Sequence, residues 1–167
     1  MLTRINNEND RMFIHYGSDR YDINKFQLIQ NAPMEKPVGG LWACDVKTRF
    51  GWKEWCLSEE MYPPESKRLK ECFRFRLKKD ALILHLKEPE DFEFLPIQWS
   101  KFREERTYNP YLNPKTDRFR FVNWAEIKNI GIDAVEYIRT PYGHEVFYTW
   151  DFDSLVVLNP DAVIPVA

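Results

Sequence analysis

Three short segments of the 167-residue sequence hold side chains that could bind a flat ligand and act on it. The first is His15-Tyr16-Gly17, in which a glycine closely follows an imidazole. The second begins with Gly39-Gly40-Leu41-Trp42-Ala43 and continues in Gly51-Trp52-Lys53-Glu54-Trp55-Cys56, so that paired glycines precede several indoles. The third is Asp151-Phe152-Asp153, a pair of carboxylates that precedes an apolar stretch and would lie on one side of an extended segment.

Together, these residue types suit a planar heteroaromatic ligand that is attached to a sugar. Indole faces stack on a flat ring, glycine lets the main chain approach and hydrogen-bond an amide, and histidine can bind a hydroxyl. A carboxylate stabilises positive charge where it develops during a reaction. The combination predicts a pocket for a nicotinamide riboside group.

Each segment also has a purely structural interpretation. His15 could be a half-buried, hydrogen-bonded histidine at a strand end. Trp52 and Trp55 are three residues apart, so they could share one helical face and pack in the core. Asp151 and Asp153 could be turn residues or solvated charges. Each residue type is therefore ambiguous alone, and the functional interpretation depends on the three segments occurring together.

The strands that would position these residues follow from apolar patterning. A short strand is expected over residues 11–16, with His15 near its end, and another over residues 41–44. Apolar and basic residues alternate over 72–77 and an apolar run follows at 81–86, which predicts an antiparallel hairpin. Its phase points Phe73, Phe75 and Leu77 inward. Further strands are expected at 132–138, 146–150 and 155–158.

The helices are expected to be few and short. Aromatic and apolar residues recur three and four positions apart over 50–61, which predicts a helix capped by Thr48 or Asp45. A second is expected at 124–128 with Asn123 as its N-cap, and a third helical stretch near 99–106. Since strands and helices do not alternate regularly, the chain is predicted to be one α+β domain over residues 1–167.

In these three segments the sequence resembles the ADP-ribosyltransferase fold family, in particular the branch of diphtheria toxin and the poly(ADP-ribose) polymerases. The resemblance covers the three segments, about a quarter of the chain, in the family's order. Gly40-Leu41-Trp42-Ala43 is similar to the family's Gly-Ile-Tyr-Phe-Ala with one residue fewer, and Trp55-Cys56 is similar to its aromatic-Cys helix end. The resemblance implies a mixed, mostly antiparallel split sheet with a few short helices, and NAD as a consumed co-substrate.

The resemblance also implies roles for the candidate residues. His15 would bind the adenosine-side ribose, Gly17 the nicotinamide carboxamide, and Trp42 with Trp52 or Trp55 the nicotinamide ring. Tyr16 and Gly40 complete the NAD-contacting set. The catalytic residues would be Asp153, as the catalytic carboxylate, Asp151, as the upstream acidic residue, and His15. Asp153 replaces the family's glutamate and is one methylene shorter, and Trp42 lacks the family's tyrosine hydroxyl.

Composition narrows the class of protein. Six Trp, eight Tyr and twelve Phe exclude a disordered chain, and no apolar run is long enough to span a membrane. The start of the chain lacks the apolar stretch of a signal peptide, so we expect a cytoplasmic protein. The three cysteines, an odd number, never form C-x-x-C, so neither a disulfide framework nor a metal site is expected. The sequence contains no G-x-G-x-x-G motif, which would indicate a Rossmann site.

The charge is distributed unevenly. The net charge is −2, but residues 67–120 contain 14 Lys and Arg against 9 Asp and Glu. This basic middle could bind phosphates or simply be a solvated face.

Several functions are therefore open. The first is an ADP-ribosyltransferase or NAD glycohydrolase that acts on a protein, nucleic acid or small-molecule acceptor. The second is a catalytically inactive member of the same fold that binds a nucleotide or a partner. The third is an unrelated nucleic-acid-binding module that uses the basic hairpin at 72–86.

Overall fold

Short β-strands form most of the regular structure in the computed structural model, which describes residues 11–32, 36–93, 95–101, 118–141, 143, 147 and 149–166. The strands are β1 (Phe13–Tyr16), β2 (Leu41–Asp45), β3 (Cys72–Leu77), β4 (Ile83–Leu86), β5 (Ile97–Lys101), β6 (Arg118–Val122), β7 (Ala134–Tyr137), β8 (Ser154–Val157) and β9 (Val163–Val166). The helices are α1 (Trp52–Ser58), α2 (Lys67–Lys70), α3 (Pro89–Glu93) and α4 (Trp124–Asn129), with 3-10 turns η1 (Ile23–Lys25) and η3 (Pro160–Ala162).

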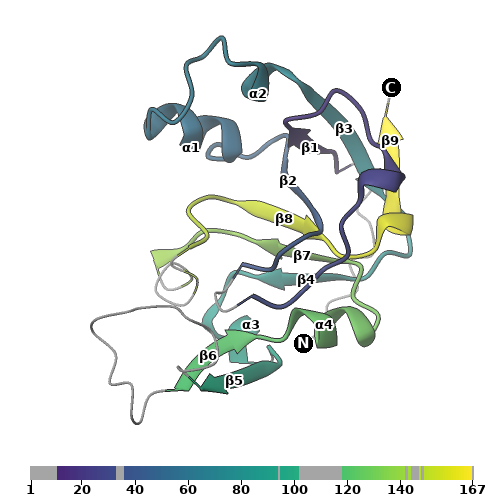
Figure 1. Cartoon of the computed structure of the whole chain (residues 1–167), viewed down its shortest axis with the longest axis vertical. Coiled ribbons are helices and arrows are strands. Elements are labelled where there is room, and N and C mark those ends of the chain that lie inside the picture. Colours follow the sequence, from purple (N-terminus) through teal and green to yellow (C-terminus); the bar gives the residue numbers. More distant parts are fainter. Residues whose placement is uncertain are drawn as a thin grey trace.

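Seven strands form one sheet in the order β4-β7-β8-β2-β1-β3-β9 (Figure 1). All neighbours in it are antiparallel except β4 and β7, and β5 pairs separately with β6. The prediction of one α+β domain with a mostly antiparallel sheet is confirmed. None of the helices in the described ranges has both the length and the apolar character needed to cross a bilayer.

The sheet opens between β1 and β2. These strands are paired at only two positions, Phe13 with Asp45 and Ile14 with Cys44. β1 pairs with β3 over four positions, whereas β2 pairs with β8 from Leu41 to Ala43. Figure 1 shows β3 and β9 standing at a large angle to β8, β7 and β4. The end of β1 and the start of β2 therefore form a fork.

Two apolar clusters hold this arrangement together. Leu155 and Val157 of β8 belong to the cluster that includes strands β1, β3 and β9, whereas Val156 and Leu158 belong to the cluster under α3 and α4. Successive strand residues point to opposite faces, so both faces of β8 are buried. This explains why the sequence is apolar without interruption from 155 to 158.

The predicted hairpin over residues 72–86 is wrong, although both of its strands exist. β3 lies between β1 and β9, whereas β4 pairs in parallel with β7 at the far edge of the sheet. Asp133 holds the start of β4 away from β3, because its carboxylate accepts from the Leu82 N–H and its own N–H donates to the Leu82 oxygen. The predicted inward phase of β3 is confirmed, since Phe73, Phe75 and Leu77 are all buried.

The helix predictions are partly confirmed. Asn123 caps α4 by accepting from the Glu126 N–H, as predicted. The helix predicted over 50–61 is shorter, and its N-cap is Gly51 rather than Thr48 or Asp45. The Thr48 hydroxyl donates instead to Asp153, and Asp45 Oδ2 accepts from Arg11.

Two further predictions fall partly outside the described residues. Residues 99–101 belong to β5 rather than to the predicted helical stretch, because they pair with β6, and 102–117 are not described. Of the strand expected at 146–150, only residues 147, 149 and 150 are described, and none is in a strand.

Candidate functional site: an aromatic cavity at the fork

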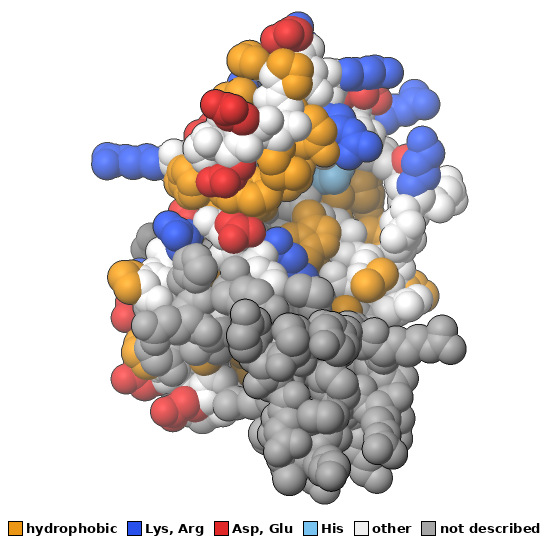
Figure 2. Space-filling view, turned by 60° about the vertical axis from the view of Figure 1, so that its left-hand side comes forward, with side chains coloured by type: hydrophobic (Ala, Val, Ile, Leu, Met, Phe, Trp, Pro, Cys, Tyr) orange, Lys and Arg blue, Asp and Glu red, His pale blue; other side chains and the backbone are white. Residues whose placement is uncertain are grey.

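A cavity of about 310 Å³ lies at the fork between β1 and β2. The described residues that line it come from β1, β2, α1 and the segments before β2 and β8: Ile14, His15, Tyr16, Lys36, Trp42, Ala43, Trp52 and Phe152. Figure 2 shows a face that is hollowed between hydrophobic side chains, with a histidine ring and basic side chains beside the hollow. The cavity is predominantly apolar and has the size of a small-molecule site.

His15 spans the fork. Its Nδ1 atom lies 2.7 Å from the main-chain oxygen of Trp42, and its ring packs on Phe73 with centroids 5.0 Å apart. A carbonyl oxygen only accepts, so Nδ1 carries the hydrogen. Burial lowers the pKa of His15, which outweighs the opposite effect of this hydrogen bond. The ring is therefore neutral at pH 7, and Nε2 is a hydrogen-bond acceptor.

Tyr16 and Trp42 continue the wall on either side of the fork. Burial raises the pKa of Tyr16 to about 12, so its hydroxyl stays protonated at neutral pH and can donate. The Trp42 indole N–H donates to the Gly39 oxygen at 3.1 Å, and its ring meets Trp150 edge-on at 4.9 Å. The orientation of Trp42 is thus set before any ligand binds.

The opposite wall is a cluster of three aromatic rings. Trp52, Trp55 and Phe152 pack against one another with centroids 5.5 to 5.7 Å apart. Trp52 and Phe152 line the cavity, whereas Trp55 is not among the described lining residues and contacts both of their rings. Of the two indoles proposed for this wall, the structure places Trp52 at the cavity.

The two candidate glycines have mainly structural roles. The Gly17 N–H donates to the Glu71 oxygen, and Gly17 is not among the described lining residues. The Gly40 N–H donates to the Gln27 oxygen. A Cβ atom on Gly40 would lie 2.7 Å from Val156 Cγ2, so glycine permits the close approach of this loop to β8. Neither N–H group is therefore free to donate a hydrogen bond to the oxygen of a ligand amide.

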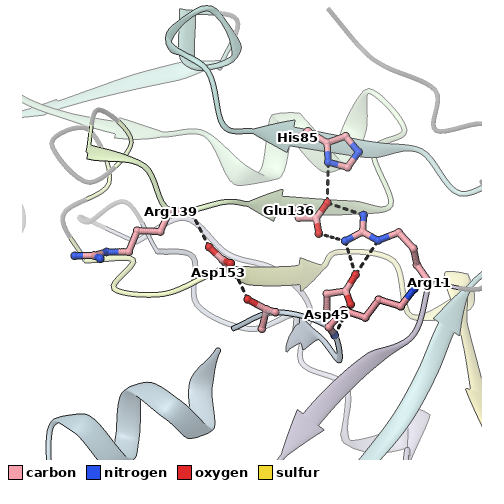
Figure 3. A network of polar contacts seen from close by, with 8 residues as sticks. Arg11, Asp45, His85, Glu136, Arg139 and Asp153 are labelled. Carbon is pink, nitrogen blue, oxygen red and sulfur yellow. Dashed lines mark hydrogen bonds and ion pairs between the residues drawn. The ribbon is translucent and has the colours of Figure 1, made fainter. Parts of the chain in front are cut away.

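The two carboxylates of the third segment have different partners, and the chain bends at Phe152 between them. Asp151 is not among the described lining residues of the aromatic cavity, but it pairs with one of them, since its Oδ2 lies 3.9 Å from Lys36 Nζ. Asp153 accepts from the Thr48 hydroxyl at 2.7 Å and from the Arg139 N–H at 2.8 Å (Figure 3). Asp153 is not among the described lining residues of the aromatic cavity and lines a second, polar cavity instead.

Next to Asp153, a network of charged residues joins three strands and was not anticipated from the sequence. Arg11 binds both Asp45 of β2 and Glu136 of β7, and His85 Nδ1 of β4 lies 2.8 Å from Glu136 (Figure 3). Burial alone would raise the pKa of Glu136, but hydrogen bonds from His85 and Arg11 outweigh it and lower the pKa to about 2. Such a weak base is a structural group rather than a proton acceptor at neutral pH.

Sequence reasoning also missed Lys36 and Phe152 as cavity residues. The charged network around Glu136 did have a signal in the sequence of β7, where this one glutamate interrupts an otherwise apolar strand. No comparable signal marked Lys36, which lies in a loop segment. Within the described part of the chain, no three His, Cys, Asp or Glu side chains are grouped so that they could hold a metal ion.

The sequence matches no protein-family model, and searches of the curated proteins and of the solved structures find no significant match.

Proposed function

We propose that the protein binds NAD with the nicotinamide half in the aromatic cavity and transfers ADP-ribose from it to water or to an acceptor. The observation that carries this proposal is that His15, Trp42 and Phe152, from three distant segments, meet around one cavity. The three segments lie on or next to the neighbouring strands β8, β2 and β1. The acceptor is a protein, a nucleic acid or a small molecule, and we expect the reaction to take place in the cytoplasm.

The chemistry follows from the groups at the cavity. The bond between nicotinamide and ribose breaks with its electron pair leaving on nicotinamide, so the ribose becomes positively charged. Trp42 and Trp52 hold the flat leaving group, and Nε2 of His15 accepts a ribose hydroxyl. The acceptor oxygen or nitrogen then bonds to the anomeric carbon and gives up its proton to solvent water.

Asp151 is our candidate for the carboxylate that stabilises this charge. It is paired with Lys36, a residue of the cavity wall, whereas both Asp153 oxygens are engaged elsewhere. We therefore assign the role expected of Asp153 to its neighbour, and give Asp153 a role in holding the segment before β8.

A second candidate function is nucleotide binding without catalysis. It is favoured by the finding that no carboxylate is among the described residues lining the cavity. The nucleic-acid alternative is weaker, because the hairpin on which it depended does not form.

The test measures binding and turnover separately. NAD is titrated against tryptophan fluorescence, and release of free nicotinamide is measured by chromatography, for the wild type, Asp151→Asn and Asp153→Asn. We expect Asp151→Asn to lower nicotinamide release by about a hundredfold or more while NAD still binds. Asp153→Asn should change release much less.

The other outcomes decide between the candidates. Quenching by NAD without any nicotinamide release by the wild type would favour the binding protein. Release that survives in Asp151→Asn but disappears in a folded Asp153→Asn would return the catalytic role to Asp153. No binding of NAD at millimolar concentration would overturn the proposal.

A further inference from the structure

Lys36 gives the aromatic cavity a charge that its other walls lack. It is the one Lys or Arg side chain among the described lining residues, and its Nζ atom lies 5.9 Å from the centre of the Phe152 ring. Its side chain is 36% exposed, so the ammonium group is partly withdrawn from water. Its position places a positive charge at the boundary between the aromatic wall and solvent.

The ion pair of Lys36 with Asp151 is loose. The nitrogen and oxygen atoms are 3.9 Å apart, whereas charge-assisted hydrogen bonds are typically about 2.7 to 2.9 Å long. Burial lowers the pKa of Lys36, since withdrawal from water disfavours the charged form, and Asp151 compensates only in part. The ammonium group therefore has donors to offer to a closer anion.

We propose that Lys36 binds a phosphate of the ligand in the aromatic cavity, exchanging its ion pair with Asp151 for the phosphate oxygens, so that the cavity selects nucleotides over nucleosides. This inference extends the proposed function, and it rests on that function for the identity of the nucleotide, which would be the nicotinamide half of NAD. A flat base held by Trp42 and Trp52 and a phosphate at Lys36 would occupy the two chemically distinct parts of the cavity wall.

The exchange has a consequence for Asp151. Once Lys36 turns to the phosphate, the Asp151 carboxylate loses its positive partner and can face positive charge on the ribose. Removing the carboxylate should also remove a competitor for Lys36. The Asp151→Asn variant should thus bind phosphorylated ligands more tightly than the wild type does.

The experiment compares ligands that differ only by a phosphate. Nicotinamide riboside with nicotinamide mononucleotide, and adenosine with AMP, are titrated by tryptophan fluorescence. The variants are Lys36→Met, Lys36→Arg and Asp151→Asn. Lys79→Met and Asp80→Asn are the matched controls, because both residues are exposed and lie outside the described cavity lining.

We expect the wild type to bind the phosphorylated member of a pair about tenfold more tightly. Lys36→Met should abolish this preference without weakening nucleoside binding, Lys36→Arg should retain most of it, and Asp151→Asn should increase it. The two control variants should bind as the wild type does.

Equal affinities for nucleotide and nucleoside in the wild type would overturn the inference, as would an equal loss of preference in Lys79→Met. A preference that depends on Lys36 for AMP, with no binding of either nicotinamide compound, would support the phosphate site and contradict the proposed NAD function. Absence of binding by all four compounds at millimolar concentration would overturn both.

Discussion

The Nδ1–H group of His15 donates a hydrogen bond of 2.7 Å to the main-chain oxygen of Trp42, across the fork where β1 and β2 separate. The last registered pair between these strands is Ile14 with Cys44, so the side chain replaces the next main-chain link. One nitrogen of the ring is thus bonded across the fork, and the other, in a residue that lines the cavity, can accept a hydrogen bond. The two nitrogens of one imidazole are thus divided between a structural hydrogen bond and an acceptor that the proposed ligand would use.

This division predicts a pH dependence of ligand binding. The pKa of His15 is lowered from 6.5 by burial, so the neutral ring with a free Nε2 acceptor dominates above about pH 6.5. NAD affinity should be constant above neutrality and fall as the pH drops through the folded-state pKa. The same sign holds for stability: a histidine buried in its neutral form stabilises the fold above pH 6.5, and this contribution is lost on acidification. Titrations of NAD from pH 8 to pH 5 measure the effect.

The variant His15→Asn separates the two nitrogens. The asparagine amide can replace Nδ1–H as the donor to Trp42, but it has no equivalent of Nε2. We expect it to fold normally, to bind NAD about tenfold more weakly, and to lose the pH dependence of binding. In the control His85→Asn, which lies outside the described cavity lining, NAD affinity should be unchanged. A His15→Asn protein that keeps wild-type affinity would show that Nε2 does not contact the ligand.

The two neighbouring indoles of α1 should differ in their effect on binding. Trp52 lines the cavity, whereas Trp55 is not among the described lining residues and packs against Trp52 at 5.6 Å between ring centroids. Trp52→Leu should weaken NAD binding by about tenfold, the equivalent of one lost stacking contact. Trp55→Leu should weaken binding much less and should leave most of the NAD-dependent quenching. Equal losses in the two variants, measured by calorimetry, would indicate general damage to α1 rather than a stacking site.

The network around Glu136 should contribute to stability rather than to binding. Glu136→Gln removes the buried charge that pairs with Arg11 and His85, and we expect a loss of about 3 kcal/mol in the free energy of unfolding at pH 7. Urea denaturation measures the loss. The exposed Glu65→Gln variant is the control and should change stability little.

The same network predicts the acid sensitivity of the fold. The pKa of Glu136 is lowered from 4.5 to about 2, so the native state favours its ionised form. Its contribution is fully present above about pH 5 and is lost as the pH falls from 4.5 towards 2. The stability difference between wild type and Glu136→Gln should therefore narrow across that range. A difference that stays constant down to pH 2 would contradict the assignment.

Local patterns predicted much of the fold. The alternation in residues 72–77 correctly placed Phe73, Phe75 and Leu77 in the core. Asn123 was correctly predicted as a cap because its hydrogen-bond partner, the Glu126 N–H, is only three residues away in the sequence. The prediction failed for the partner of β4. Nothing within residues 81–86 indicates that they pair with β7, because that choice depends on Asp133, about fifty residues away.

In the candidate site, too, some features follow from the local sequence and others depend on contacts between distant segments. By itself, the sequence determined that His15 lies near a strand end, and its residue types led to the proposal of a nicotinamide ligand, since residue type and strand periodicity are local properties. Only the tertiary structure decided that Trp52 rather than Trp55 lines the cavity and that Lys36 joins it. The bend at Phe152 sends Asp151 and Asp153 to different neighbourhoods. These outcomes depend on contacts between segments far apart in the chain, which no local pattern specifies.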